Sequence, residues 1–136
     1  MKEAKIQAQI HTWCYERGIK WAAIPNATFT SSWHAINQNK LLGVQRGVPD
    51  FMCIIPSKYR RDNMAMLIFI ELKTAKGKPS KEQLEWIESL QECDGVNAAI
   101  CYGYDDCIEY LSSCLELVPI IPETTEAERE EFIHNL

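Results

Sequence analysis

Several features that would assign this 136-residue chain to a special class are missing from its sequence. No apolar stretch approaches the roughly 18 consecutive apolar residues of a membrane-spanning helix. The first residues alternate charged and apolar side chains, and they lack both the apolar core of a secretory signal and the Arg-rich character of a transit peptide. We therefore expect a soluble, cytoplasmic protein that does not associate with membranes.

The cysteines form no recognisable ligand or disulfide pattern. None of them belongs to a CxxC pair, and several occupy apolar positions of expected strands or helices; the six are Cys14, Cys53, Cys93, Cys101, Cys107 and Cys114. Because a free cysteine packs like a small apolar side chain, we interpret them as reduced core residues rather than as zinc ligands or disulfides. Internal repeats and low-complexity tracts are also absent, and the length suits a single domain with one core.

An excess of positive charge is missing as well, since 14 basic residues face 19 acidic ones and the net charge is −5. Residues 122–136 hold five Glu and one Arg and carry most of this negative charge. The basic residues gather elsewhere, at Arg46, between Lys58 and Arg61, and between Lys73 and Lys81. A local basic surface can bind phosphates on an acidic protein, so the charge balance allows a nucleic-acid partner that is bound in a salt-sensitive way.

Apolar periodicity predicts an α/β domain in which helices flank a central mixed sheet. The expected helices span residues 2–17, 80–93 and 105–114, and the expected strands span residues 48–55, 66–74 and 96–103. Residues 20–25 form a short extended piece. The polar stretch at 26–39 is expected to be mainly loop, with a short helix over 33–42. The first two strands are joined by a turn-rich basic loop, which favours an antiparallel hairpin.

The C-terminal part of the chain has a different composition. Leu115–Ile121 is apolar enough for an edge strand, and Thr125 with Glu128 forms a capping-box signature for a last, acidic helix. We therefore divide the chain into a folded domain at 1–121 and an acidic C-terminal helix or tail at 122–136.

Charged residues stand out within the expected strand at 66–74. Side chains alternate across a sheet, so Glu71 and Lys73 lie side by side at the end of an otherwise apolar row. A charge in such a row is costly unless it is paired or bound to a metal ion. A structural salt bridge is the simpler interpretation of this pair alone.

A third residue changes that interpretation. Gly47 and Pro49 bend the chain just before Asp50, and Asp50 reaches Glu71 if the two strands are neighbours. Two carboxylates beside a lysine form an oxygen-rich site that suits Mg²⁺, which keeps some of its waters and binds substrate phosphate. Such an ion activates a water molecule and neutralises charge on a phosphodiester, which makes phosphodiester hydrolysis the reaction that fits.

These motifs support a family resemblance. The combination of GVPD at 47–50, ExK at 71–73 and KGKPSKEQ at 76–83 resembles the VRR-Nuc branch of the PD-(D/E)xK nucleases, over about residues 3–103. The resemblance implies a restriction-endonuclease-like core, and it implies that Asp50, Glu71 and the Leu72 carbonyl bind the metal while Lys73 serves the attacking water. It also implies catalytic contributions from Glu3 in the first helix and from Gln83.

Glu3 and Gln83 each have a second interpretation. Gln83 points along the apolar face of its helix, toward the sheet, but Ser80 with Gln83 also forms a capping box. Glu3 lies on the buried stripe of the first helix, although a residue so near the end of the chain is often solvated.

Loops around the motifs supply the candidate nucleic-acid contacts, because ligands are commonly bound by loops that a rigid scaffold positions. These candidates are Asn26, Arg46, Lys76, Lys78 and Ser80. His34 is also near the motifs, but we interpret it as a polar loop residue rather than a metal ligand.

The expected function is that of a metal-dependent DNA endonuclease that uses Mg²⁺, with Mn²⁺ as a substitute and without an organic cofactor. Stand-alone VRR-Nuc proteins are similar to junction-cleaving enzymes of phages and bacteria, so the resemblance implies branched DNA, a homodimer, and a bacterial or phage-infected cell. The alternative is a nucleic-acid or partner-binding module without turnover. The sequence leaves open the shape of the substrate, the choice between DNA and RNA, the polarity of cleavage and the oligomeric state.

Overall fold

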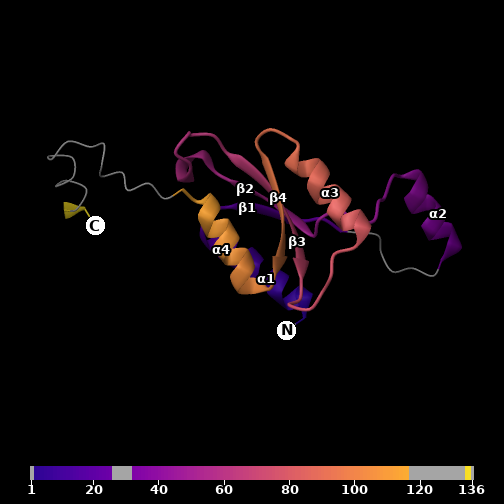
Figure 1. The fold of residues 1–136 in the computed structure, drawn as a ribbon. Helices are drawn as coiled ribbons and strands as arrows, with labels where there is room; N and C mark the ends of the chain where they lie inside the picture. Colours follow the sequence, from indigo (N-terminus) through magenta and orange to yellow (C-terminus); the bar gives the residue numbers. More distant parts are fainter. Residues whose placement is uncertain (1, 26–31, 117–133, 136) are drawn as a thin grey trace.

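The computed structural model describes residues 2–25, 32–116 and 134–135. Within these residues the chain forms one four-stranded sheet with helices on both faces (Figure 1). The elements are α1 (Glu3–Glu16), β1 (Lys20–Ala23), α2 (Trp33–Leu41), β2 (Phe51–Ile55), a 3₁₀ turn (Ser57–Tyr59), β3 (Met66–Lys73), α3 (Lys81–Gln91), β4 (Val96–Tyr102) and α4 (Tyr104–Cys114). The predicted α/β fold with a mixed sheet is confirmed.

The sheet has the strand order β1-β2-β3-β4. The pairs β1–β2 and β2–β3 are antiparallel, so the predicted hairpin is confirmed, while β3–β4 is parallel and is joined by α3 as a crossover. The extended piece predicted at 20–25 is confirmed, and its first four residues form the edge strand β1. The predicted start of the next strand was wrong, since β2 begins at Phe51 rather than at residue 48 because the chain still bends around the buried Pro49.

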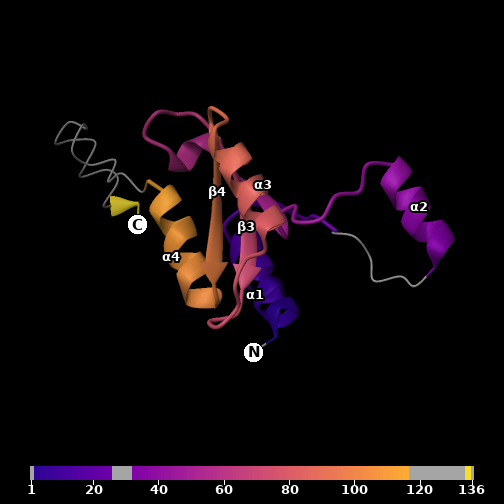
Figure 2. The same ribbon diagram turned by 45° about the vertical axis from the view of Figure 1, so that its right-hand side comes forward.

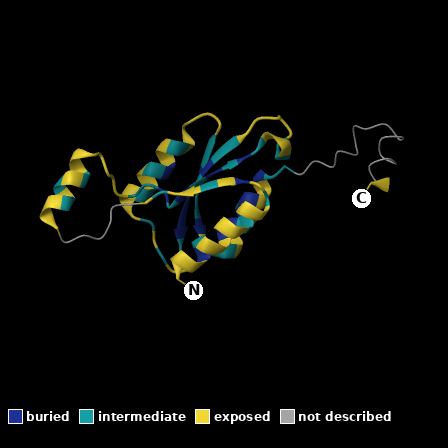
Figure 3. Cartoon of the chain, turned by 180° about the vertical axis from the view of Figure 1, so that it is seen from behind, coloured by how far each residue is buried: buried dark blue, intermediate teal, exposed yellow. Residues whose placement is uncertain are grey.

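The core lies between the sheet and the helices α1 and α4. Alternate residues of the two central strands point into it, and all of them are buried: Phe51, Cys53 and Ile55 from β2, and Ile68, Ile70 and Leu72 from β3. Opposite them lie Ile6, Ile10 and Cys14 of α1 and Cys107, Leu111 and Cys114 of α4. Figure 3 shows buried residues along the strands of the sheet. The register therefore sends the other alternate set, which contains Glu71, toward α3.

The six cysteines are free, and five of them are buried in this core as predicted. Cys93 is the exception, because it lies exposed just beyond α3 rather than on the buried face of that helix. Burial raises the pKa of the Cys114 thiol, which keeps it in the neutral form that suits an apolar core.

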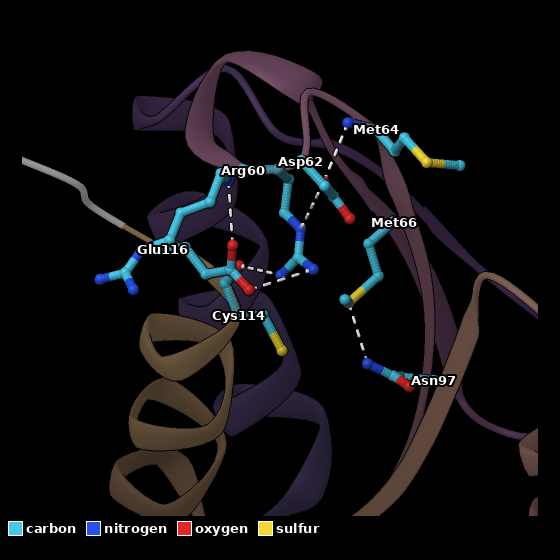
Figure 4. A network of polar contacts seen from close by, with 8 residues as sticks. Arg60, Asp62, Met64, Met66, Asn97, Cys114 and Glu116 are labelled. Carbon is cyan, nitrogen blue, oxygen red and sulfur yellow. Dashed lines mark hydrogen bonds and ion pairs between the residues drawn. The ribbon is translucent and has the colours of Figure 1, made fainter. Parts of the chain in front are cut away.

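The loop between β2 and β3 is tied to the end of α4. Arg60 donates from Nη1 to the Cys114 carbonyl at 2.9 Å and pairs through Nη2 with Glu116 at 3.2 Å (Figure 4). The Arg61 backbone N–H also donates to Glu116, at 2.9 Å. The Arg60 side chain is only 10% exposed. This part of the predicted basic surface is therefore a structural anchor, and Arg60 does not present its charge to a ligand.

Two predicted elements, the edge strand at Leu115–Ile121 and the helix that begins near Thr125, lie almost entirely outside the described residues. Helix α2 is placed as predicted but stands away from the body of the domain, as both ribbon views show (Figures 1 and 2). Among the described helices, none has the length and apolar character to cross a membrane.

Candidate active site

The strand register brings Asp50 and Glu71 together. Phe51 is paired with Ile70 across the antiparallel ladder, so Asp50, one residue earlier, lies opposite Glu71 on β3. Asp50 is held there by its Oδ2, which accepts a hydrogen bond of 2.7 Å from the Leu72 backbone N–H, and by its carbonyl, which accepts from the Ile24 N–H at 2.8 Å. The sequence-based expectation that Asp50 reaches Glu71 is confirmed as a matter of geometry.

Glu71 is a buried carboxylate that its surroundings satisfy only in part. Its exposure is 3%, and it is the one charged residue that is buried among the described positions. Its Oε1 accepts a hydrogen bond of 2.5 Å from Gln83 Nε2 and lies 3.9 Å from Lys73 Nζ. Its Oε2 is buried and has no hydrogen-bond partner in the described part of the chain. A buried, unpaired carboxylate oxygen is costly, so this atom needs either a proton or a cation.

The pKa values of the two carboxyl groups reflect the same arrangement. Burial, followed by the charge of Asp50, raises the pKa of Glu71 to about 8, against the opposing effect of Lys73. Burial also raises the pKa of Asp50, although the hydrogen bond from Leu72 offsets part of that rise. Without a cation the pair therefore retains a proton near neutral pH, because two close carboxylates resist double ionisation.

The donor set fits a hard divalent cation. Asp50 and Glu71 supply two neighbouring carboxylates, and a cation beside the unpartnered Oε2 of Glu71 would remove the cost of burying that oxygen. Within the described residues, no three His, Cys, Asp or Glu side chains converge closely enough to hold a metal ion between them. Two protein carboxylates suit Mg²⁺, which keeps waters and substrate oxygens in its remaining positions.

Gln83 makes two contacts, one in the cap of α3 and one with Glu71. Its Oε1 accepts a hydrogen bond of 2.8 Å from the Ser80 N–H, while Ser80 Oγ accepts from the Gln83 N–H at 3.2 Å, so the capping box at the start of α3 is confirmed. The amide Nε2 of the same side chain donates to Glu71. Gln83 therefore fixes the carboxylate of Glu71 relative to the first turn of α3.

Gly47 joins the loop before Asp50 to the same helix. Its φ is +87°, and a Cβ at this position would lie 2.6 Å from the Glu82 carbonyl carbon and 2.8 Å from the Gln83 nitrogen. Only glycine allows the backbone to approach α3 so closely in this conformation. The loop that carries Asp50 and the helix that carries Gln83 are thus in direct contact.

Lys73 ends β3, and its side chain is only 17% exposed. A turn follows in which the Gly77 N–H donates to the Thr74 carbonyl at 2.9 Å, and a Cβ on Gly77 would lie 3.3 Å from Lys73 Cδ. Lys76 and Lys78 flank this glycine and are exposed. The turn therefore places two open basic side chains beside the half-buried lysine.

The remaining sequence candidates are placed as follows. Glu3 is exposed on the first turn of α1, and after the larger effect of burial its charge also raises the pKa values of Asp50 and Glu71, so it lies in their electrostatic range. Arg46 is exposed in the loop before Asp50, and His34 is exposed on α2, away from the carboxylates. Asn26 lies outside the described residues. The metal-binding role of the Leu72 carbonyl and the nucleic-acid contact of Ser80 stay predictions.

With this geometry established, comparisons with known proteins assign the family. The model of the VRR-NUC domain matches residues 1–105. The chain belongs to the VRR-NUC family. A solved structure described as a VRR_NUC domain protein has the same fold, with a TM-score of 0.62 and 20% sequence identity over 86% of this chain and 90% of that chain. The search of curated proteins finds no match.

Sequence reasoning missed three features of the VRR-NUC site. It treated the capping and active-site roles of Gln83 as alternatives, whereas the two ends of one amide make both contacts. It gave Gly47 a local bend but not its contact with α3, and it did not foresee the unpartnered oxygen of Glu71. A glycine placed just before the motif is the sequence signal that could have indicated a positive φ and a close backbone approach.

Proposed function

We propose that this VRR-NUC domain is a metal-dependent DNA endonuclease that acts on branched DNA as a homodimer. The observation that carries the proposal is the buried Glu71 carboxylate, with one oxygen unpartnered, directly opposite Asp50 and beside Lys73. A structural salt bridge alone does not account for it, because a second carboxylate without its own cation destabilises such a cluster.

Asp50, Glu71 and the Leu72 carbonyl are the groups that would hold Mg²⁺, or Mn²⁺ in its place. The ion supplies charge neutralisation at the scissile phosphate and lowers the pKa of a bound water. Gln83 keeps the Glu71 carboxylate oriented, and the hydrogen bond from Leu72 does the same for Asp50. The side chains that set the geometry are therefore themselves fixed by neighbours.

Lys73 is the group that acts on the water and on the developing charge. Its Nζ lies 3.9 Å from Glu71 Oε1, so it stands at the edge of the carboxylate pair and reaches a water or a phosphate oxygen bound beside it. As an ammonium it stabilises negative charge in the transition state, and as an amine it accepts a proton from the water. Lys76 and Lys78 provide exposed positive charge for the flanking phosphates.

The choice of a homodimer follows from the single proposed site in each chain, and the choice of branched DNA follows from the resemblance to stand-alone VRR-Nuc proteins. Symmetric cutting of two strands requires two sites at a fixed spacing, which a two-fold dimer provides. The test is a gel cleavage assay of the wild-type protein on linear duplex, single-stranded, flap and four-way-junction DNA with Mg²⁺, Mn²⁺ or EDTA. Preferred, metal-dependent cutting of the junction supports the proposal, and equal cutting of all four substrates contradicts the substrate choice.

The alternative is a binding module that keeps the fold without turnover. It predicts that the folded protein binds DNA but cleaves none of the four substrates with either metal ion. Retention of Asp50, Glu71 and Lys73 in one cluster favours the enzyme, because a binding module needs no buried carboxylate pair.

A further inference from the structure

The most exposed apolar part of the described chain is the arm at residues 32–46, which consists of α2 and the loop after it. No residue of α2 is buried, and the arm stands away from the domain in all three ribbon views (Figures 1, 2 and 3). Its exposed apolar side chains are Trp33 (78%), Ile36 (37%), Leu41 (86%), Leu42 (71%) and Val44 (38%). An isolated helix of this length is marginal in water, so the arm requires a surface to pack against.

The charge of the arm is opposite to that of the rest of the molecule. Residues 17–49 contain Arg17, Lys20, Lys40 and Arg46 but no acidic residue. The other 103 residues hold ten basic residues against nineteen acidic ones. The arm therefore combines an apolar surface with positive charge, and its complement is an apolar surface bordered by acidic side chains.

The domain carries such a surface at the free edge of β4. A groove of about 610 Å³ runs there between α3 and α4, lined by Ile87, Gln91, Ala98, Ile100 and Tyr110 together with the adjoining β4 residues. No strand pairs with this edge among the described residues, and Gln91 Nε2 donates to the Ala98 carbonyl at 3.0 Å. Leu84 of α3, on the same side of the helix as Gln91, is 42% exposed and continues the apolar surface.

Acidic side chains outnumber basic ones on the two helices that form the groove. The exposed residues of α3 and its C-terminal cap include Glu82, Glu85, Glu88 and Glu92, and those of α4 include Asp105, Asp106 and Glu109. Against these, Lys81 is the one basic residue of α3, and α4 has none.

We propose that the arm at 32–46 of one copy of this chain packs into the β4-edge groove of a second copy, with Lys40 and Arg46 facing the acidic residues of α3. Each copy contributes one arm and one groove, so a two-fold dimer repeats the contact and leaves neither surface exposed. DNA is the less suitable occupant of the arm, because five large apolar side chains outnumber its two basic ones. The proposal names the surface of the homodimer proposed above.

The mass in solution tests this contact without DNA or metal, so the result is independent of whether the protein cleaves. Wild type should sediment at twice the chain mass of 15.6 kDa at tens of micromolar. Leu41→Glu with Leu42→Glu should give monomers, and so should Lys40→Glu with Arg46→Glu. Lys58→Glu, at an exposed position outside the arm, is the charge control and should remain dimeric.

Charge exchange identifies the receiving surface. Glu85→Lys with Glu88→Lys should also give monomers, and combining this change with Lys40→Glu and Arg46→Glu should restore the dimer. A monomeric wild type overturns the proposal. It is also overturned if every one of these variants remains dimeric. If arm variants stay dimeric but lose junction binding, the arm contacts DNA and the proposal is wrong. If removing residues 117–136 converts a monomeric wild type to a dimer, that segment occupies the groove and the proposal is equally wrong.

Discussion

At the scale of single residues, the decisive feature of the site is the buried Glu71 carboxylate, one oxygen of which has no hydrogen-bond partner among the described residues. Glu71 has an ordinary pKa of 4.5 in the unfolded chain and one of about 8 in the folded domain, so the folded state binds the extra proton. The free energy of unfolding should therefore fall as the pH rises from about 4.5 to about 8 and then level off. Asp50, whose pKa is also raised, contributes a slope of the same sign.

Glu71→Gln should remove most of this pH dependence. Chemical denaturation at pH 5 and pH 8 should show the variant close to wild type at pH 5 and more stable at pH 8, by on the order of a few kcal/mol. Adding Mn²⁺ at pH 8 should stabilise wild type but not the variant. A wild-type stability that rises between pH 5 and pH 8 would contradict the assigned environment of Glu71.

Asp50→Asn should weaken metal binding and abolish cleavage, because it removes one of two carboxylates from the proposed metal site. Calorimetric titration with Mn²⁺ should show a loss of affinity of at least about tenfold, in line with the loss of a direct ligand. Wild-type affinity in this variant would make Asp50 a structural residue.

A matched pair of variants separates the two contacts of Gln83, the cap of α3 and the hydrogen bond to Glu71. Ser80→Ala removes a capping partner without touching Glu71, whereas Gln83→Ala removes both contacts. Both should lower stability by about 0.5–2 kcal/mol through the lost cap. Only Gln83→Ala should also lower strongly the single-turnover cleavage rate at saturating DNA, where a lost phosphate contact of Ser80 has little effect. If the two variants lose equal activity, the hydrogen bond to Glu71 has no catalytic importance.

At the scale of elements, the site depends on the contact between the loop before Asp50 and the start of α3. Gly47 packs its backbone on Glu82 and Gln83 at a positive φ. Gly47→Ala should lower the melting temperature and the activity together, since the added methyl group displaces either Asp50 or α3. Gly18, which lies outside both the site and the arm at 32–46, also has a positive φ but has no neighbour within 4 Å of a Cβ, so Gly18→Ala serves as the control for backbone strain alone. An equal effect of the two changes would show that the contact with α3 is unimportant.

The elements also show what the sequence can and cannot predict. The long strand β3 and helix α3 follow from periodicity and a capping box, so their residues were predicted closely. β1 was predicted only as an extended piece and not as a member of the sheet, because four residues with mostly exposed side chains do not show the alternation of a half-buried strand. Asp50 was matched with Glu71 correctly because a hairpin register fixes the face of every residue. The groove at β4 and the anchoring of Arg60 depend on tertiary contacts that no local pattern encodes.

At the scale of the whole molecule, the basic and acidic residues are separated, so the net negative charge does not prevent DNA from approaching the site. Lys73, Lys76 and Lys78 lie together at one end of β3, while much of the acidic excess lies on α3, on α4 and in residues 122–136. We expect modest DNA affinity that depends strongly on salt. With several phosphate contacts, the affinity should fall by about 10³-fold between 50 and 200 mM salt. Filter binding with a Lys76→Ala, Lys78→Ala variant should show a shallower salt slope. An unchanged slope would place the phosphate contacts elsewhere.

The central claim is that Asp50, Glu71 and Lys73 form a metal-dependent hydrolytic site, and Lys73→Ala tests it most directly. Single-turnover cleavage of a four-way junction should be measured for wild type and Lys73→Ala with Mg²⁺ and with EDTA, alongside the junction affinity of each. The account predicts metal-dependent cutting by wild type and loss of cutting in the variant, with nearly unchanged binding, because Lys73 acts mainly in the transition state. Undiminished cutting by Lys73→Ala, or cutting by wild type in EDTA, would contradict it.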